Sequence, residues 1–172
     1  TVLEKSSIAP LNEVLFNVEK LDYLINGILD YSTIDNQNSE NQTVNLNSII
    51  QEVLKLILIP ENITIKVQEN LPILTGNNWK FSQLFQNLIQ NAIKYNNKPN
   101  GNIEIGFTEK ENQYQFFVKD NGIGIKAAYF DQIFKVFTKL ESTSSSSGIG
   151  LSIVKKIVTF YNGKIWLESE EE

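Results

Sequence analysis

The hydrophobic pattern of the chain changes at one polar stretch, residues 35–43. This stretch has no apolar side chain and cannot contribute to a core, so it is predicted to be a linker. Before it the apolar residues keep one helical period, and after it helical and strand periods alternate. The 172-residue chain is therefore expected to contain a separate helical element and an α+β domain.

The segment before the linker has the apolar spacing of a coiled coil. Steps of three and four residues alternate along one seam, made by Leu11, Val14, Val18, Leu21, Ile25 and Ile28. A second row, at Leu15, Leu24 and Leu29, widens this face as in a four-helix bundle. Pro10 suits the first helical position, so the helix is predicted from Pro10 to Ile34. The alternative is an ordinary amphipathic helix packed on its own domain.

After the linker, helices and strands are both expected. Asn45 and Asn77 can cap two helices, and a third is predicted at about 149–161. Alternating apolar residues predict strands at 62–69, 102–108 and 114–118, and another that contains Ile165 and Leu167. The polar residues 109–113 predict a hairpin loop. The expected fold is an α+β two-layer sandwich, in which helices cover a mixed sheet.

Composition excludes several functional classes. The chain has no cysteine and no histidine, so disulfides, thiolate or histidine metal sites and histidine general bases are absent. A net charge of −5 argues against binding to nucleic-acid phosphates. No apolar run is long enough to span a membrane. Because the chain contains no methionine, even at its first position, it is interpreted as a fragment of a longer protein.

Two pairs of glycines indicate a binding site. Gly122 and Gly124 follow a predicted strand, whereas Gly148 and Gly150 open a predicted helix. The first pair matches a relaxed dinucleotide-binding pattern, but the parallel strand and acidic residue that such a site needs do not follow it. At the start of a helix, the second pair can expose backbone N–H groups to a phosphate. A flexible helix entry without a ligand is the alternative.

The middle helix carries a polar face. Asn87, Asn91 and Lys94 are spaced so that they lie on one side of it. Two amides and an ammonium can hold a hydrated Mg²⁺ and triphosphate oxygens. A solvated polar face is the alternative.

In this order the motifs resemble those of the ATP-binding catalytic domain of sensor histidine kinases, which has the Bergerat fold. The matching segments are the N box at 87–95, the G1 box at 120–124, the F box at 133–137 and the G2 box at 147–151. Residues 21–32 resemble the second helix of the dimerisation hairpin of the same family. The resemblance implies a dimerisation helix at 1–35, a linker at 36–43 and a catalytic domain at 44–172.

The resemblance also implies roles for the residues of the N box. Asn91 would be the Mg²⁺ ligand, and Asn87 would support it from one turn earlier. Lys94 would pair with phosphate, which makes Asn91 and Lys94 the expected catalytic residues. Tyr95 would lie beside the nucleotide.

The glycine boxes would bind the two ends of ATP. Asp120 would accept a hydrogen bond from the adenine amine, and Gly122 and Gly124 would let the backbone approach the base. The remaining assignments concern the phosphates and a lid at 138–147: Phe134 and Phe137 under the lid, Lys139 near the terminal phosphate, and Gly148 and Gly150 at the phosphates. Ser146 departs from the family pattern, which commonly has glycine there.

The implied function is transfer of the γ-phosphoryl of ATP to a histidine of the dimerisation domain, for relay to a response regulator. The expected cofactors are ATP and Mg²⁺. The expected partners are a second copy, bound through the N-terminal helix, and a receiver domain, with neither nucleic acid nor membrane. A cytoplasmic location is expected, whether or not the parent protein is membrane-anchored. Because the fragment has no histidine and is interpreted to begin after the acceptor helix, it is not expected to autophosphorylate.

Two alternatives remain. A non-kinase ATPase of the same fold commonly places a glutamate where Asn87 stands, and an amide cannot act as that base. A degenerate pseudokinase that dimerises and docks a partner is the other.

Overall fold

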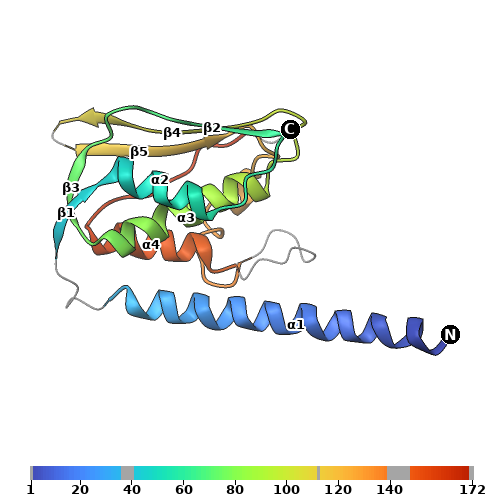
Figure 1. The fold of residues 1–172 in the computed structure, drawn as a ribbon. Helices are drawn as coiled ribbons and strands as arrows, with labels where there is room; N and C mark the ends of the chain where they lie inside the picture. Colours follow the sequence, from blue (N-terminus) through green and yellow to red (C-terminus); the bar gives the residue numbers. More distant parts are fainter. Residues whose placement is uncertain (1, 36–40, 112, 139–147, 171–172) are drawn as a thin grey trace.

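The chain forms a sheet layer, a helical layer and a long outer helix. In the computed structural model, which describes residues 2–35, 41–111, 113–138 and 148–170, the long helix is α1 (Val2–Thr33). It lies along the side of the helical layer that faces away from the sheet (Figure 1). The predicted α+β sandwich is therefore confirmed.

The main sheet is mixed and has the order β2-β4-β5. Strands β2 (Ile63–Val67) and β4 (Gly101–Lys110) are parallel, and β5 (Gln113–Asp120) is antiparallel to β4. Ile103 and Ile105 alternate with exposed residues along β4 and are buried against the helices. A smaller antiparallel sheet, which the sequence analysis did not predict, joins β1 (Gln42–Asn45) to β3 (Ile73–Gly76).

Three helices cover the sheet from one side (Figure 1): α2 (Leu46–Leu56), α3 (Asn78–Lys94) and α4 (Gly150–Phe160). A short 3₁₀ helix, η1 (Ala127–Tyr129), follows β5. The predicted caps are confirmed, because Asn45 accepts a hydrogen bond from Ser48 N and Asn77 accepts one from Lys80 N. Both side chains therefore satisfy backbone donors that a helix start leaves unpaired.

Some boundaries were predicted wrongly. α1 begins at Val2, so Pro10 lies inside the helix rather than at its start. An interior proline removes one helical hydrogen bond and its ring crowds the carbonyl group four residues earlier, but here the helix continues past it. Gln42 and Thr43 belong to β1, although their composition is that of a linker. Residues 163–170 form no strand, because a strand needs a hydrogen-bonded neighbour that apolar alternation alone does not supply.

The C-terminal end of α1 packs on α4, while most of its apolar seam is exposed. Ile34 is fully buried in a cluster with Ile149, Ile153 and Ile157 of the α4 region. By contrast, the seam residues have exposed fractions between 49 and 59 %: Leu11, Val14, Val18, Leu21, Ile25 and Ile28. No helix in the described part of the chain is both long and apolar enough to cross a membrane.

One charged side chain is buried between α3 and α4. Lys80 is 1 % exposed and its Nζ has no hydrogen-bond partner, but lies 3.2 Å from the centroid of the Phe160 ring. Burial lowers the pKa of Lys80 from its ordinary value of 10.5, and the nearby Asp35 carboxylate partly opposes this shift. The ring face offsets some of the cost of burying the ammonium.

Replacing Lys80 by methionine should change how stability depends on pH. Because the pKa of Lys80 is lower in the folded protein, the unfolded chain binds more protons up to pH 10.5, and the free energy of unfolding should rise with pH in that range. Lys80→Met should remove this rise and be at least as stable as the wild type at pH 7. Urea denaturation between pH 7 and 10 measures both effects, with the exposed Lys66→Met as control. An unchanged pH dependence in Lys80→Met would contradict the prediction.

Candidate functional site

Helix α3 and helix α4 meet at the second glycine pair. A Cβ atom added to Gly150 would lie 2.7 Å from Asn87 Oδ1, so the first turn of α4 lies directly against this amide. Asn87 Nδ2 donates a hydrogen bond to the carbonyl of Gln83 (2.7 Å). The amide is therefore oriented with its oxygen toward the start of α4.

The first glycine pair lies against the other end of α3. A Cβ atom on Gly122 would lie 2.4 Å from the carbonyl oxygen of Tyr95, and Ile123 N donates to that same oxygen (3.1 Å). Only glycine permits this approach to backbone that cannot move aside. The contact brings the N-box and G1-box segments together, as the sequence motifs imply.

Asp120 lies at the end of β5 with an exposed side chain. Its Oδ1 accepts a hydrogen bond from Gly122 N (2.8 Å), which fixes the carboxylate on the turn. Within the described residues, Oδ2 has no partner. The carboxylate can thus hold its own turn and still accept a hydrogen bond from a ligand.

Asn121 fastens this turn to the loop between α3 and β4. Its Oδ1 accepts hydrogen bonds from Asn96 Nδ2 (2.9 Å) and Asn102 N (2.7 Å), and its Nδ2 donates to the carbonyl of Asn100 (3.1 Å). No role was predicted for Asn121 from the sequence. The only feature of the sequence that could have indicated this role is the high asparagine content of the loop. Composition does not show which amide groups form hydrogen bonds with each other.

The start of α4 is shaped for an anion. Gly148 adopts φ +72°, a conformation that glycine reaches without strain, and a Cβ there would lie 2.8 Å from the carbonyl oxygen of Thr138. α4 begins without a side-chain cap. Its first backbone N–H groups therefore lack helical partners and, with the helix dipole, favour a negatively charged ligand.

The other residues predicted for the site differ in their exposure to solvent and in their position. Asn91 is half-buried on α3, whereas Lys94 is exposed, with Nζ 5.5 Å from the centroid of the Tyr95 ring. Gly124, with φ +70°, is half-buried in the turn after Asp120. Lys139 and the lid residues 139–147 lie outside the described part of the chain.

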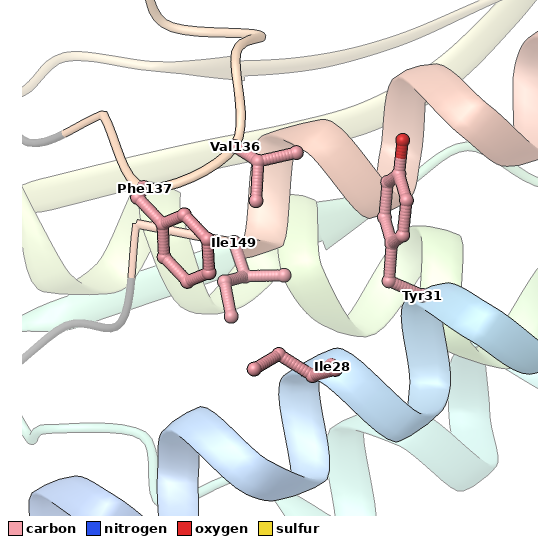
Figure 2. Close-up of a pocket in the computed structure, with 5 residues that line it drawn as sticks. All are labelled: Ile28, Tyr31, Val136, Phe137 and Ile149. Carbon is pink, nitrogen blue, oxygen red and sulfur yellow. The ribbon is translucent and has the colours of Figure 1, made fainter.

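Because residues 139–147 lie outside the described part of the chain, the expectation that Phe134 and Phe137 pack beneath the lid stays a prediction. Phe134 is half-buried, but Phe137 is 56 % exposed. The backbone turns at Phe137, with φ +64°, and its ring lines an apolar pocket of about 330 Å³ beside Val136 and Ile149. Figure 2 shows this pocket between the start of α4 and Ile28 and Tyr31 of α1. Its lining is mainly apolar, so the pocket itself offers little to an anionic ligand.

The donor atoms present suit a hard cation only if a ligand supplies most of its oxygens. No group of three or more acidic, histidine or cysteine side chains gathers in the residues that the structure describes. The amide oxygens of Asn87 and Asn91 are of the type that Mg²⁺ accepts, and Mg²⁺ commonly completes its shell with phosphate oxygens and water. The residues present therefore fit a cation that arrives together with a phosphate ligand.

Gly122→Ala should destabilise the chain by about 1–3 kcal/mol, because the added methyl group meets the backbone carbonyl of Tyr95. Gly27→Ala is a matched control. Its added methyl group would lie 3.0 Å from Cδ1 of Ile149, and this side-chain tip can move aside. Urea denaturation measures both free energies of unfolding. Equal stability of Gly122→Ala and the wild type would show that the turn is not held against α3.

The sequence and the fold both match known proteins. Residues 76–172 match the family described as histidine kinase-, DNA gyrase B- and HSP90-like ATPases. The chain is 35% identical over 158 residues to cyanobacterial phytochrome B of Nostoc sp. (strain PCC 7120). The aligned region covers 88% of this chain and 21% of that protein. The chain spans about a fifth of the length of these curated relatives, which include phytochromes and a methanogenesis regulatory histidine kinase.

Solved structures agree with this match. The catalytic domain of histidine kinase ThkA is 29% identical, with a TM-score of 0.63, over 77% of this chain and 89% of that chain. Full-length ShkA, solved in complex with AMPPNP, is 21% identical with a TM-score of 0.74, over 99% of this chain and 37% of that chain. At that identity, ShkA supports the fold alone.

Proposed function

This chain belongs to the family of histidine kinase-, DNA gyrase B- and HSP90-like ATPases and contains the ATP-binding catalytic domain of a sensor histidine kinase. On this basis we propose that the domain binds ATP with Mg²⁺ and directs the γ-phosphoryl group to a histidine of a dimerisation domain. The phosphoryl group then passes to an aspartate of a response regulator.

The observation that carries this proposal is that one glycine of each pair lies against α3. Gly150 lies against Asn87 and Gly122 lies against Tyr95, and these α3 residues are separated by about 12 Å along the helix axis. One end offers an anion-binding helix start, and the other offers a carboxylate with a free acceptor oxygen. This arrangement suits a ligand with phosphates at one end and an amine-bearing ring at the other. AMPPNP, the ligand of ShkA, is such a molecule.

Within this arrangement, each predicted residue has a task. Asp120 reads the adenine amine, while Gly122 and Gly124 let the base lie close to the backbone. Asn91 and Lys94 lie on α3 between the two ends, where an amide oxygen can ligate Mg²⁺ and an ammonium can pair with phosphate. The ion, when bound, neutralises charge on the phosphates. Transfer then depends on positioning and on charge stabilisation rather than on a protein base.

We propose the division of the chain that the sequence implied, with one change. Residues 1–35 form the dimerisation helix and 44–172 the catalytic domain, but of the linker predicted at 36–43, Gln42 and Thr43 belong to β1 and so to the catalytic domain. The exposed seam of α1 pairs with a second copy, since apolar side chains at heptad spacing lose contact with water when helices associate. The location is cytoplasmic, where ATP and a receiver domain are available.

Hydrolysis of ATP by water is disfavoured. Asn87 stands where a base would be needed, its amide cannot accept a proton at neutral pH, and its Nδ2 is engaged with Gln83. The other alternative is a degenerate pseudokinase that dimerises and docks a partner; titration with ATP and binding assays with a receiver domain discriminate it from a kinase.

Asp120→Asn should weaken ATP binding about 10- to 150-fold, which corresponds to the loss of a charge-assisted hydrogen bond of about 1.5–3 kcal/mol. Asparagine keeps an oxygen for Gly122 N, so folding should be retained, but its amide group places a donor toward the adenine amine. The wild type should also prefer ATP to GTP, because guanine presents a carbonyl where adenine presents an amine. Calorimetry with both nucleotides measures these affinities.

Lys94→Ala is the matched control for base reading. It should weaken the binding of both nucleotides equally, since an ammonium that pairs with phosphate does not sense the base. If the wild type binds ATP and GTP with equal affinity, Asp120 does not read adenine.

Leu21→Asp should shift the chain from dimer to monomer, because it places a charge in the centre of the seam. Each well-buried apolar side chain of the seam contributes about 1.5–3 kcal/mol. Light scattering across a concentration series measures the change, and Asn17→Asp, an exposed change off the seam, should leave the dimer intact. Identical monomers at all concentrations for wild type and Leu21→Asp would refute dimerisation through this helix.

A further inference from the structure

One lysine of α4 contacts the C-terminal end of α1. Lys156 Nζ donates a hydrogen bond to the carbonyl of Tyr31 (2.7 Å) and forms an ion pair with Asp35 Oδ2 (2.7 Å). The same ammonium lies 4.1 Å from the centroid of the Tyr31 ring. The side chain of Lys156 is 19 % exposed, so these contacts are partly shielded from solvent, although Asp35 itself is 73 % exposed.

These contacts supply what α1 lacks. The last turn of α1 contains no basic residue, although the carbonyl groups there have no helical partner and carry the negative end of the helix dipole. Thr33 Oγ1 donates to the carbonyls of Leu29 and Asp30. Lys156 reaches the next carbonyl, that of Tyr31, from a different helix. It therefore acts as a cap supplied by the catalytic domain.

The apolar contacts connect the same junction to the proposed phosphate site. Ile149 stands between Gly148 and Gly150, and a Cβ on Gly27 of α1 would lie 3.0 Å from its Cδ1. Figure 2 shows Ile149 facing Ile28 across the apolar pocket. The end of α1 therefore rests on the residue that joins the two phosphate-binding glycines.

Apolar contact alone does not fix an angle, since burial is non-directional and a pocket remains between α1 and α4. A hydrogen bond to one carbonyl together with an ion pair to a side chain one turn later is directional. The direction in which α1 leaves the domain thus depends on Lys156 more than on the isoleucines around it.

We propose that Lys156 is a positioning residue that sets the orientation of α1 relative to the phosphate-binding end of α4. It would thereby determine where a phosphoryl acceptor carried by the helical element meets the nucleotide. This inference rests on the proposed function, because it assigns Lys156 a part in presenting the acceptor. Lys156 touches neither the nucleotide nor the acceptor and acts only through the junction.

The chain is well suited to a distance measurement, because it contains no cysteine. Asn17→Cys on α1 and Glu104→Cys on β4, both exposed, can carry spin labels. Dilution with excess unlabelled chain restricts the signal to distances within one molecule. In this background the variants are Lys156→Ala, Lys156→Arg and, as control, Lys155→Ala, which removes the neighbouring exposed lysine of α4.

The wild type, Lys155→Ala and Lys156→Arg should give one narrow distance distribution, since arginine can keep both contacts. Lys156→Ala should at least double the width of the distribution, while ATP affinity measured by calorimetry stays within twofold of the wild type. An unchanged width in Lys156→Ala would overturn the proposal, and so would failure of arginine to restore it. If Lys156→Ala does not fold, Asp35→Asn, which removes only the ion pair, should broaden the distribution, and an unchanged width there would equally overturn it.

The two proposals can fail separately. Absence of ATP binding in the wild type would refute the proposed function, whatever the distance distributions show. Normal ATP binding with a width that does not depend on Lys156 would refute only the positioning role.

Discussion

The packing of α3 between the sheet and α4 is the constraint on which the rest of the structure depends. On one side, α3 buries Phe85 and Ile89, and the Phe85 ring makes an edge contact with Phe116 of β5 (centroids 6.2 Å apart). On the other side, the Phe81 ring stacks on Tyr161, whose hydroxyl accepts a hydrogen bond from Asn77 N (2.9 Å). These contacts hold α3 against the sheet and fix its start against the end of α4. The start of α4 consequently lies opposite the middle of α3.

That alignment explains why glycines occupy the site. Gly150 and Gly122 both approach α3 closely, one at the side-chain amide of Asn87 and the other at the backbone carbonyl of Tyr95, and the second approach leaves no room for a side chain. The site is therefore assembled mainly from backbone, and its polar side chains stand at the edges. Asp120 is such a side chain: one carboxylate oxygen accepts the hydrogen bond from Gly122 N, and the other has no hydrogen-bond partner among the described residues. A backbone site of this kind is preorganised as soon as the core has formed.

The junction of α1 with α4 combines two kinds of interaction. Burial of Ile34 anchors the helix end, and the cluster around Lys156 gives the contact a direction. Lys80 adds a second ammonium between α3 and α4, over the ring of Phe160, near the same Asp35 carboxylate. The exposed seam of α1 is then left for a partner, while its last turns belong to the catalytic domain.

Local rules in the sequence determined the parts of the fold that depend on local physics. Asn45 and Asn77 begin helices as predicted because a cap depends only on residues within one turn, and alternation along β4 fixed which face is buried. The order of the glycine and asparagine motifs was likewise readable along the chain.

Tertiary structure alone decided the rest. Ile165 and Leu167 alternate like a strand, yet no strand pairs with them, and Gln42 and Thr43 look like a linker, yet they pair with β3. The hydrogen bonds of Asn121 with Asn96 and Asn102, and the hydrogen bond of Lys156 with the end of α1, join residues far apart in sequence. Such contacts leave no local pattern, because they depend on where the packed core places each backbone carbonyl.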